Sequence, residues 1–416
     1  MDESPNREEI RRQLSRLEGV VRGFKNLTST SEAAPAPASH PDAPLPGDVV
    51  ATDHGPTWVA RRTYPQAHVH GAYRLGELAA LPADALALLD AEADLGPRPA
   101  FLDTETTGLA GGAGTLVFLT GVGVWTGESV ELHQVFLRDP DEESAAMAHL
   151  DALLADVTGL VTFNGRAFDL PLLKTRFVLQ RRPARWCALP HLDLLTVARR
   201  LWRDHLASRR LGHLEEAILD VHRTADDMPG WMIPAAYRRY LRTGATGEIR
   251  RIFYHNEIDI LSLVTLLTHT GRLVAAPEAI EPAAGEWAGL GRVYETADQI
   301  ERAEAAWRCA LDADTLPDDV AARLWRDLGL RPKRAAQWKA ALEIWRQWAK
   351  RQPHAVEPLV ECAKYYEWQV KELEKALAAT QRALARVETW PQGRQRWRAL
   401  AELRHREERL ERKLST

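Results

Sequence analysis

The chain has 416 residues and an apolar fraction of 45%, which is enough for two or three globular domains. A net charge of −4 excludes a general attraction to nucleic acid, so any such binding requires a local basic patch. The three cysteines lie far apart, which argues against a disulfide framework or a zinc finger, and we expect a cytoplasmic protein without a signal peptide or a membrane-spanning helix.

The first part of the chain is expected to contribute little to a core. Apolar residues at helical spacing predict an amphipathic helix over 5–27, and the Ser-, Ala- and Pro-rich residues that follow predict a linker up to residue 48. A strand over 58–64 and one or two short helices within 75–92 come next. The first domain boundary is therefore expected after residue 48.

Three strands are predicted over 99–104, 116–125 and 129–137, and the second is apolar enough to be central. The first strand ends in Asp103 and Glu105. Side chains two residues apart on a strand point to the same face, so these two carboxylates are expected side by side. Their repulsion and desolvation favour a hard divalent cation between them over the alternative of two solvated acids on a surface strand.

A glycine-rich loop over 108–114 joins the first two strands. It lacks the Gly-Lys-Ser/Thr ending of a phosphate-binding loop, and no helical pattern follows it. We interpret it as a hairpin connection whose small residues would let a polymer end approach the carboxylates.

A third acid follows a helix over 141–156 and a short strand that ends at Asn164. Asp169 is expected in the first turn of the next helix, a position that the helix dipole favours for an acid. Helix capping explains Asp169 when it is taken alone. Together with Asp103 and Glu105, a third metal-binding carboxylate is the better explanation.

Helices are predicted over 190–206, 211–218 and 235–243, with a turn-rich segment before the last. Arginines cluster in and after the first of these helices and again in the last. They form either a solvated face or a surface for backbone phosphates. These arginines are Arg199, Arg200, Arg203, Arg209, Arg210, Arg238, Arg239 and Arg242.

A strongly periodic helix begins near Ile252, and His255 and Asp259 lie one turn apart on one of its faces. Such a pair forms either a surface hydrogen bond or the metal ligand and general base of a metal-assisted hydrolysis. In the second case, the carboxylate holds an ion and the imidazole takes a proton from water.

The chain is expected to be helical beyond residue 275. Three triplets of small and aromatic residues recur there at the same internal spacing, which favours helical repeats of the tetratricopeptide type over 276–416. The triplets are Ala303, Trp307 and Ala310; Ala341, Trp345 and Trp348; and Ala376, Thr380 and Ala383.

The motifs resemble those of the DEDD superfamily of 3′–5′ exonucleases, and the whole chain resembles the YprB-like bacterial proteins, which join such a domain to tetratricopeptide repeats. The matching motifs are Asp-Thr-Glu-Thr-Thr-Gly at 103–108, Phe-Asn-Gly-Arg-Ala-Phe-Asp at 163–169 and Tyr-His-Asn-Glu-Ile-Asp at 254–259. The resemblance implies an α/β fold over 49–275, namely a ribonuclease H-like mixed sheet flanked by helices, followed by an all-α repeat domain.

The resemblance also implies a site with two Mg²⁺ or Mn²⁺ ions about 4 Å apart. The implied ligands are Asp103, Glu105, Asp169 and Asp259. In the family, a Tyr stands four residues before the last acid or a His stands five residues before it. Here the order is reversed, with His255 at four residues and Tyr254 at five. We favour His255 as the general base because an imidazole titrates near neutral pH, and Tyr254 is the alternative.

The implied activity is 3′–5′ exonucleolytic hydrolysis of single-stranded DNA or RNA ends. Residues close in sequence to the acids are expected to contact the terminal nucleotide, and Arg166 is expected to bind a backbone phosphate. The former are Thr106, Leu109 and Asn164. Two alternatives stay open: a catalytically weak or inactive scaffold that binds nucleic acid or protein partners through the repeats, and an endonuclease. The choice between DNA and RNA is also open.

Overall fold

A computed structural model describes residues 43–108, 114–313 and 315–415. The predicted helix over 5–27, most of the predicted linker and Leu109 lie outside the described residues. The described chain divides into two compact units. The first contains residues 43–196 and 210–272, and the second contains residues 197–209 and 273–415.

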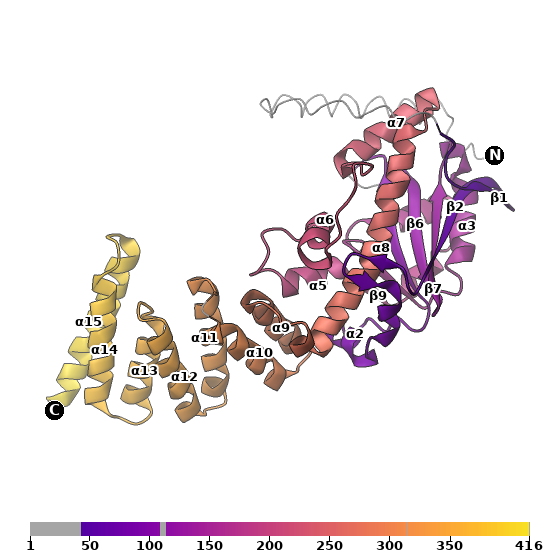
Figure 1. Ribbon diagram of the computed structural model, residues 1–416. Helices are drawn as coiled ribbons and strands as arrows, with labels where there is room; N and C mark the ends of the chain where they lie inside the picture. The colour runs from indigo at the N-terminus through magenta and orange to yellow at the C-terminus, as the bar shows by residue number, and fades with distance from the viewer. Residues whose placement is uncertain (1–42, 109–113, 314, 416) are drawn as a thin grey trace. The chain divides into compact units, whose positions relative to one another are not determined.

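The first unit is built on a mixed sheet (Figure 1). The sheet has seven strands in the order β1-β2-β7-β6-β5-β8-β9. Neighbouring strands from β1 to β5 are antiparallel, whereas β8 is parallel to β5 and β9 is parallel to β8. The strands are β1 (Asp48–Thr52), β2 (Gly55–Pro65), β5 (Pro99–Thr106), β6 (Val117–Trp125), β7 (Ser129–Phe136), β8 (Gly159–Thr162) and β9 (His191–Asp193). A short separate hairpin pairs β3 (Val69–His70) with β4 (Tyr73–Arg74).

Helices flank this sheet, which confirms the predicted fold class. Two short helices lie within 75–92 as expected, and α3 packs along β2. The helices are η2 (Leu75–Ala80), α2 (Ala83–Leu89), α3 (Glu143–Leu153), α4 (Asp169–Leu179), α5 (Leu194–Leu201), α6 (Leu211–Leu214), α7 (Ile233–Thr243) and α8 (Gly247–Ala275). Short helical turns also occur at η3 (Pro140–Glu142), η4 (Arg185–Ala188), η5 (Glu215–Leu219) and η6 (Gly230–Met232).

Two glycines on β6 allow α8 to lie directly on the sheet. The strand is buried along its whole length, as its apolar sequence predicts. A Cβ atom on Gly121 would collide with the side chain of Asn256, and one on Gly123 would collide with Ile260. Because β6 is the neighbour of β5, this close approach brings the middle of α8 next to the strand that carries Asp103 and Glu105.

The predicted helix over 190–206 is wrong at its beginning. Residues 191–193 form the edge strand β9, whose backbone groups pair with β8, and the helix begins only at Leu194. The pairing with β8 satisfies backbone groups that a helix would otherwise have satisfied internally. We had expected the arginines of residues 197–209 to belong to the domain that contains the sheet. Instead, these residues group with the C-terminal helices.

One helix bears on our expectation that the chain has no membrane-spanning helix. Among the described residues, α8 is long and apolar enough to cross a membrane by length and composition. However, 83% of its apolar window is buried within the protein, which is typical of a core helix.

The second unit is helical, as predicted. Its helices are α9 (Ala284–Thr296), α10 (Ile300–Asp312), α11 (Asp318–Arg334), α12 (Trp338–Arg351), α13 (Glu357–Trp368), α14 (Leu373–Glu388) and α15 (Arg394–Leu414). All nine residues of the three recurring triplets are buried, on α10, α12 and α14. Trp307 lies against Gly291 of the preceding helix, and Trp345 lies against Gly329 in the same way. The sequence repeat is therefore also a repeat in packing.

Candidate metal and catalytic site

The first two acids lie at the end of β5, beyond the part of the strand that pairs with β8. Asp103 and Glu105 both point towards α8, as strand alternation predicts. The Nδ2 atom of Asn256 donates to Oδ2 of Asp103 at 2.9 Å, and Oε1 of Glu105 lies 3.9 Å from Nε2 of His255.

Asp169 reaches this place from the opposite face of β5. It is the first residue of α4, as predicted, and it is buried. Its Oδ1 accepts a hydrogen bond from the hydroxyl of Thr104 at 2.5 Å, and Thr104 points away from Asp103 and Glu105 because side chains alternate along a strand. Asp169 nevertheless lies close enough to Asp103 to raise the pKa of that carboxyl by repulsion.

The turn before Asp169 is held by Asp193, a residue for which we had predicted no role. Its carboxylate accepts hydrogen bonds from the backbone N–H groups of Asn164 at 2.8 Å and Arg166 at 3.1 Å. Asn164 has a φ of +68°, a left-handed conformation that such turns require. Asp193 therefore fixes the path of the chain from β8 into α4.

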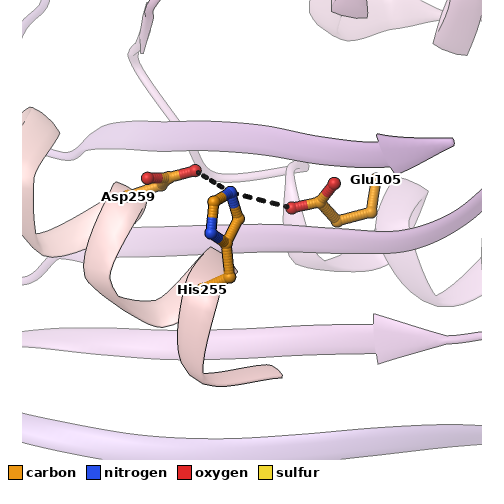
Figure 2. Close-up of side chains that lie close together, drawn as sticks. All are labelled: Glu105, His255 and Asp259. Carbon is orange, nitrogen blue, oxygen red and sulfur yellow. Dashed lines mark ion pairs between the residues drawn. The ribbon is translucent and has the colours of Figure 1, made fainter. Parts of the chain in front are cut away.

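Three of the predicted residues form a tight group. Figure 2 shows His255 between Glu105 and Asp259. The Nε2 atom of His255 lies 3.4 Å from Oδ2 of Asp259 as well as 3.9 Å from Glu105. One ligand atom from each residue lies within 4.8 Å of the other two, close enough for a single metal ion to contact all three. Asp103 and Asp169 border this group and interact with it electrostatically.

The acids are difficult to ionise together. Burial raises the pKa of Asp103 well above its usual value, and Asp259 and Asp169 raise it further. Burial and then repulsion from Asp103 have the same effect on the pKa of Glu105. Burial is also the main reason why the pKa of Asp169 rises to about 6. A divalent cation among these carboxylates would stabilise the charge that burial and repulsion make costly.

The negative charges that disfavour ionisation of the acids favour the charged form of His255. Burial lowers its pKa, but Asp259, a hydrogen bond to Asp227 and Glu105 together raise the pKa to about 10. The Nδ1 atom lies 2.7 Å from Oδ1 of Asp227 and 3.0 Å from Nη1 of Arg223. An ionised carboxylate can only accept a hydrogen bond, so the shorter contact places a proton on Nδ1, which donates to Asp227. The Nε2 atom is thereby directed towards Glu105 and Asp259.

Arg223 connects the acids around His255. It donates Nη2 to Oδ1 of Asp259 and makes two hydrogen bonds to Glu215, at 2.6 and 2.7 Å. Its Nη1 lies 3.2 Å from Oδ1 of Asp227. Glu215 is almost completely buried, so Arg223 is held firmly from behind. The ion pair fixes one oxygen of Asp259 and leaves the other directed towards His255.

Sequence reasoning had assigned no site role to several of these supporting residues. Asn256 could have been found, because it lies inside the third motif between His255 and Asp259. Arg223 and Asp227 lie in a segment without periodicity, and only the folded chain brings them to α8. The residues without a predicted role are Thr104, Asp193, Glu215, Arg223, Asp227 and Asn256.

Two of the residues expected to contact substrate have side-chain partners within the protein. The hydroxyl of Thr106 donates to the backbone oxygen of Gly108 at 2.9 Å. Arg166 is half-exposed, and its Nη2 donates to the backbone oxygen of His191 at 3.0 Å. Asn164 is exposed. Contact of these residues with a nucleotide stays a prediction.

Comparison with known proteins identifies the class of the first unit. A family model described as RNase_H superfamily matches residues 100–270. This match and the mixed sheet define an RNase H-like domain, a class that includes nucleic-acid-cleaving hydrolases.

A relative identifies the family of the whole chain. The chain is 31% identical over 334 residues to the uncharacterized protein YprB of Bacillus subtilis (strain 168), and the match covers 77% of this chain and 79% of that protein. The chain therefore belongs to the YprB family. It is also similar to the family B DNA polymerase of the hyperthermophilic archaeon Pyrobaculum calidifontis, with 14% identity and a TM-score of 0.34 over 52% of this chain and 29% of the polymerase. That similarity is too weak to support a conclusion.

Proposed function

We propose that this protein is a metal-dependent 3′–5′ exonuclease that hydrolyses single-stranded DNA or RNA ends with two Mg²⁺ or Mn²⁺ ions. One observation carries the proposal. His255 has its Nδ1 fixed by Asp227, and its Nε2 faces two acids from separate segments, Glu105 and Asp259. Membership of the RNase H-like superfamily supports a nuclease activity.

The residues present fit hard divalent cations. The proposed ligands are Asp103, Glu105, Asp169 and Asp259. Carboxylate oxygens are the donors that such ions prefer. In three of these acids, one carboxylate oxygen accepts a hydrogen bond from another side chain. The donors are Asn256 for Asp103, Thr104 for Asp169 and Arg223 for Asp259. Bound divalent ions would lower the pKa of a water molecule and would supply positive charge that stabilises the transition state.

His255 is the proposed general base. It would accept a proton at Nε2 while Asp227 holds the proton at Nδ1 and fixes the ring orientation. An imidazolium cannot accept a proton, so the raised pKa of His255 must fall first. Neutralising Glu105 and Asp259 would remove two of the interactions that raise this pKa, and burial would still lower it.

Isosteric substitutions of the acids test this proposal. Asp103→Asn and Glu105→Gln keep the shape of each side chain but remove its charge. We expect cleavage of an end-labelled oligonucleotide to fall about 100-fold or more, and calorimetry without substrate to show weaker Mn²⁺ binding. Glu128→Gln, at an exposed acid in the turn between β6 and β7, is the matched control.

Two results would contradict the assignment. Full metal-dependent cleavage by Asp103→Asn would remove Asp103 from the site. Products cut from the interior of an end-labelled strand, instead of a ladder that shortens from the 3′ end, would indicate an endonuclease. EDTA should abolish activity, and added Mg²⁺ or Mn²⁺ should restore it.

A second candidate, a catalytically inactive scaffold, is favoured by one observation. Arg223 already neutralises Asp259, so the site contains a cation of its own. If the intact protein binds nucleic acid but calorimetry detects no Mg²⁺ or Mn²⁺ binding, this second function is correct.

We also propose that α9 to α14 are repeats of the tetratricopeptide type that recruit a protein partner. The recurring contact of a tryptophan with a glycine of the preceding helix supports the repeat. The tryptophans are Trp307 and Trp345, which face Gly291 and Gly329.

A further inference from the structure

Trp231 is the most exposed large apolar side chain among the described residues, with 77% of its surface in solvent. Two residues close to it in sequence are buried instead. Met228 and Ile233, on either side of it, are buried almost completely. The segment is therefore packed into the protein on both sides of an indole that points outwards into solvent.

The segment is tied to α8 before Trp231. Arg251 donates to the backbone oxygen of Asp227 at 2.6 Å, and the backbone N–H of Thr224 donates to the hydroxyl of Tyr254 at 3.2 Å. Asp227 also holds Nδ1 of His255. Trp231 is four residues from Asp227, so their Cα atoms are at most about 14 Å apart. The backbone at Trp231 is thus held close to the segment that supports His255.

The segment is tied to the central sheet after Trp231. Arg238 of α7 donates to the backbone oxygen of Thr107 at 3.2 Å, directly after the strand that carries Glu105. The hydroxyl of Tyr237 donates to the backbone oxygen of Leu137 at 2.9 Å. Because both sides are anchored, the backbone that carries the indole is already ordered, so ligand binding does not have to order it.

Helical spacing places arginines on the same face as the indole. Trp231, Ala235, Arg238 and Arg242 are separated by four, three and four residues, which lines them up along η6 and α7. Ala235 and Arg242 are exposed, and Arg238 marks where this face meets the end of β5. The face therefore combines an aromatic ring, a small residue and two positive charges.

We propose that Trp231 is a stacking platform for a base of the single-stranded nucleic-acid substrate, with Arg238 and Arg242 towards its phosphates. This inference rests on the proposed function and extends it to a subsite outside the catalytic group. Aromatic rings next to cations are how proteins bind single strands without reading their sequence. A docking surface for a protein would need further apolar residues, and among the described residues no other large exposed one lies on η6 or α7.

Equilibrium binding tests the proposal without turnover. The parent protein is the full chain with Asp103→Asn, measured in Mn²⁺ by fluorescence anisotropy with a short labelled oligothymidylate. Adding Trp231→Ala should weaken binding about 5- to 150-fold, the range for loss of one base–aromatic stack. Trp231→Phe should restore most of the affinity because it keeps a ring. Trp397→Ala, at an exposed tryptophan of α15, is the matched control and should change nothing.

Oligonucleotides with one abasic position distinguish stacking from a general weakening. One abasic position should weaken binding to the parent protein and have no further effect on the Trp231→Ala variant, because the same stack is already lost. Unchanged binding by Trp231→Ala, or equal losses for both proteins at every abasic position, would overturn the proposal while the proposed nuclease function stands. If neither the parent protein nor the unsubstituted chain binds any oligonucleotide, both the stacking and the nuclease proposals are wrong.

Discussion

The charge of His255 depends on what neutralises Glu105 and Asp259. With both acids ionised, the imidazole keeps its proton and acts as a counter-ion. When other cations neutralise them, the same ring can become a base, with Asp227 keeping it in one orientation. One side chain can therefore stabilise the metal-free site and take part in catalysis in the loaded one.

The choice of base between His255 and Tyr254 can be made by substitution. We expect His255→Ala to lower the rate about 10²- to 10⁴-fold, the usual contribution of general base catalysis. Tyr254→Phe should cost only a few-fold, because its hydroxyl accepts a hydrogen bond from the backbone of Thr224 and serves the segment that carries Asp227. Single-turnover rates at saturating Mn²⁺ measure both. The reverse order of effects would make Tyr254 the base.

The metal-free protein should lose stability as the pH rises. The pKa of His255 is about 10 in the folded chain against 6.5 ordinarily, so its contribution is complete below pH 6.5 and disappears as the pH rises through 10. Thermal unfolding in EDTA should show a falling Tm across this window. The carboxyls of Asp103 and Glu105, whose pKa values are also raised, add a decrease in the same direction. His255→Gln should therefore make the decrease shallower without abolishing it, and an equally steep decrease in that variant would show that these acids alone are responsible.

At the residue scale, the sequence predicted the three side chains that form the tight group, but not the residues that support them. Glu105, His255 and Asp259 do lie together, because strand alternation and helical spacing follow from local geometry. The ion pair of Arg223 with Asp259 depends on how an irregular segment packs on α8, and no periodicity encodes that.

At the scale of elements, the best predictions concern segments whose pattern is strong. The apolar run of β6, the short helices within 75–92 and the periodic helix now seen as α8 were all predicted, although α8 is longer than its recognised core. The failure at β9 has a physical cause. Three residues are too few to show an alternating pattern, and their strand conformation depends on pairing with β8.

A further signal at this scale was present but unused. Gly121 and Gly123 alternate in a strand that is otherwise apolar, and such glycines mark the close approach of another element. They predict that a helix crosses β6, and the structure shows which helix it is. Without that crossing, His255 and Asp259 would not reach the end of β5.

At the scale of the whole molecule, residues 197–209 are the most consequential feature. Trp202 is completely buried, and its Nε1 donates to Glu286 at 2.9 Å. Arg292 pairs with Asp204 at 2.6 Å, and the backbone of Leu201 fills the space over Gly289. The segment belongs to the C-terminal unit in packing, although it lies well before it in sequence.

A truncated chain tests this assignment. A protein that ends at residue 275 would leave Trp202 without its covering helices, and loss of packing around a buried Trp costs about 3–5 kcal/mol. We expect lower solubility, binding of hydrophobic dyes and a lower Tm. A chain that ends at residue 392, which lacks only α15, is the control and should keep the Tm of the sheet-containing unit. Equal Tm values for the two truncated chains would contradict the assignment.

The same arrangement determines when the C-terminal unit can form during synthesis. Translation proceeds from the N-terminus, so residues 197–209 leave the ribosome before the helices that cover them have been made. All residues of the sheet-containing unit are present once residue 272 has emerged. Leu201 and Trp202 can be covered only after α9 has also been made. The newly made protein therefore passes through a stage with an uncovered apolar segment, which a chaperone could bind until translation supplies its partners.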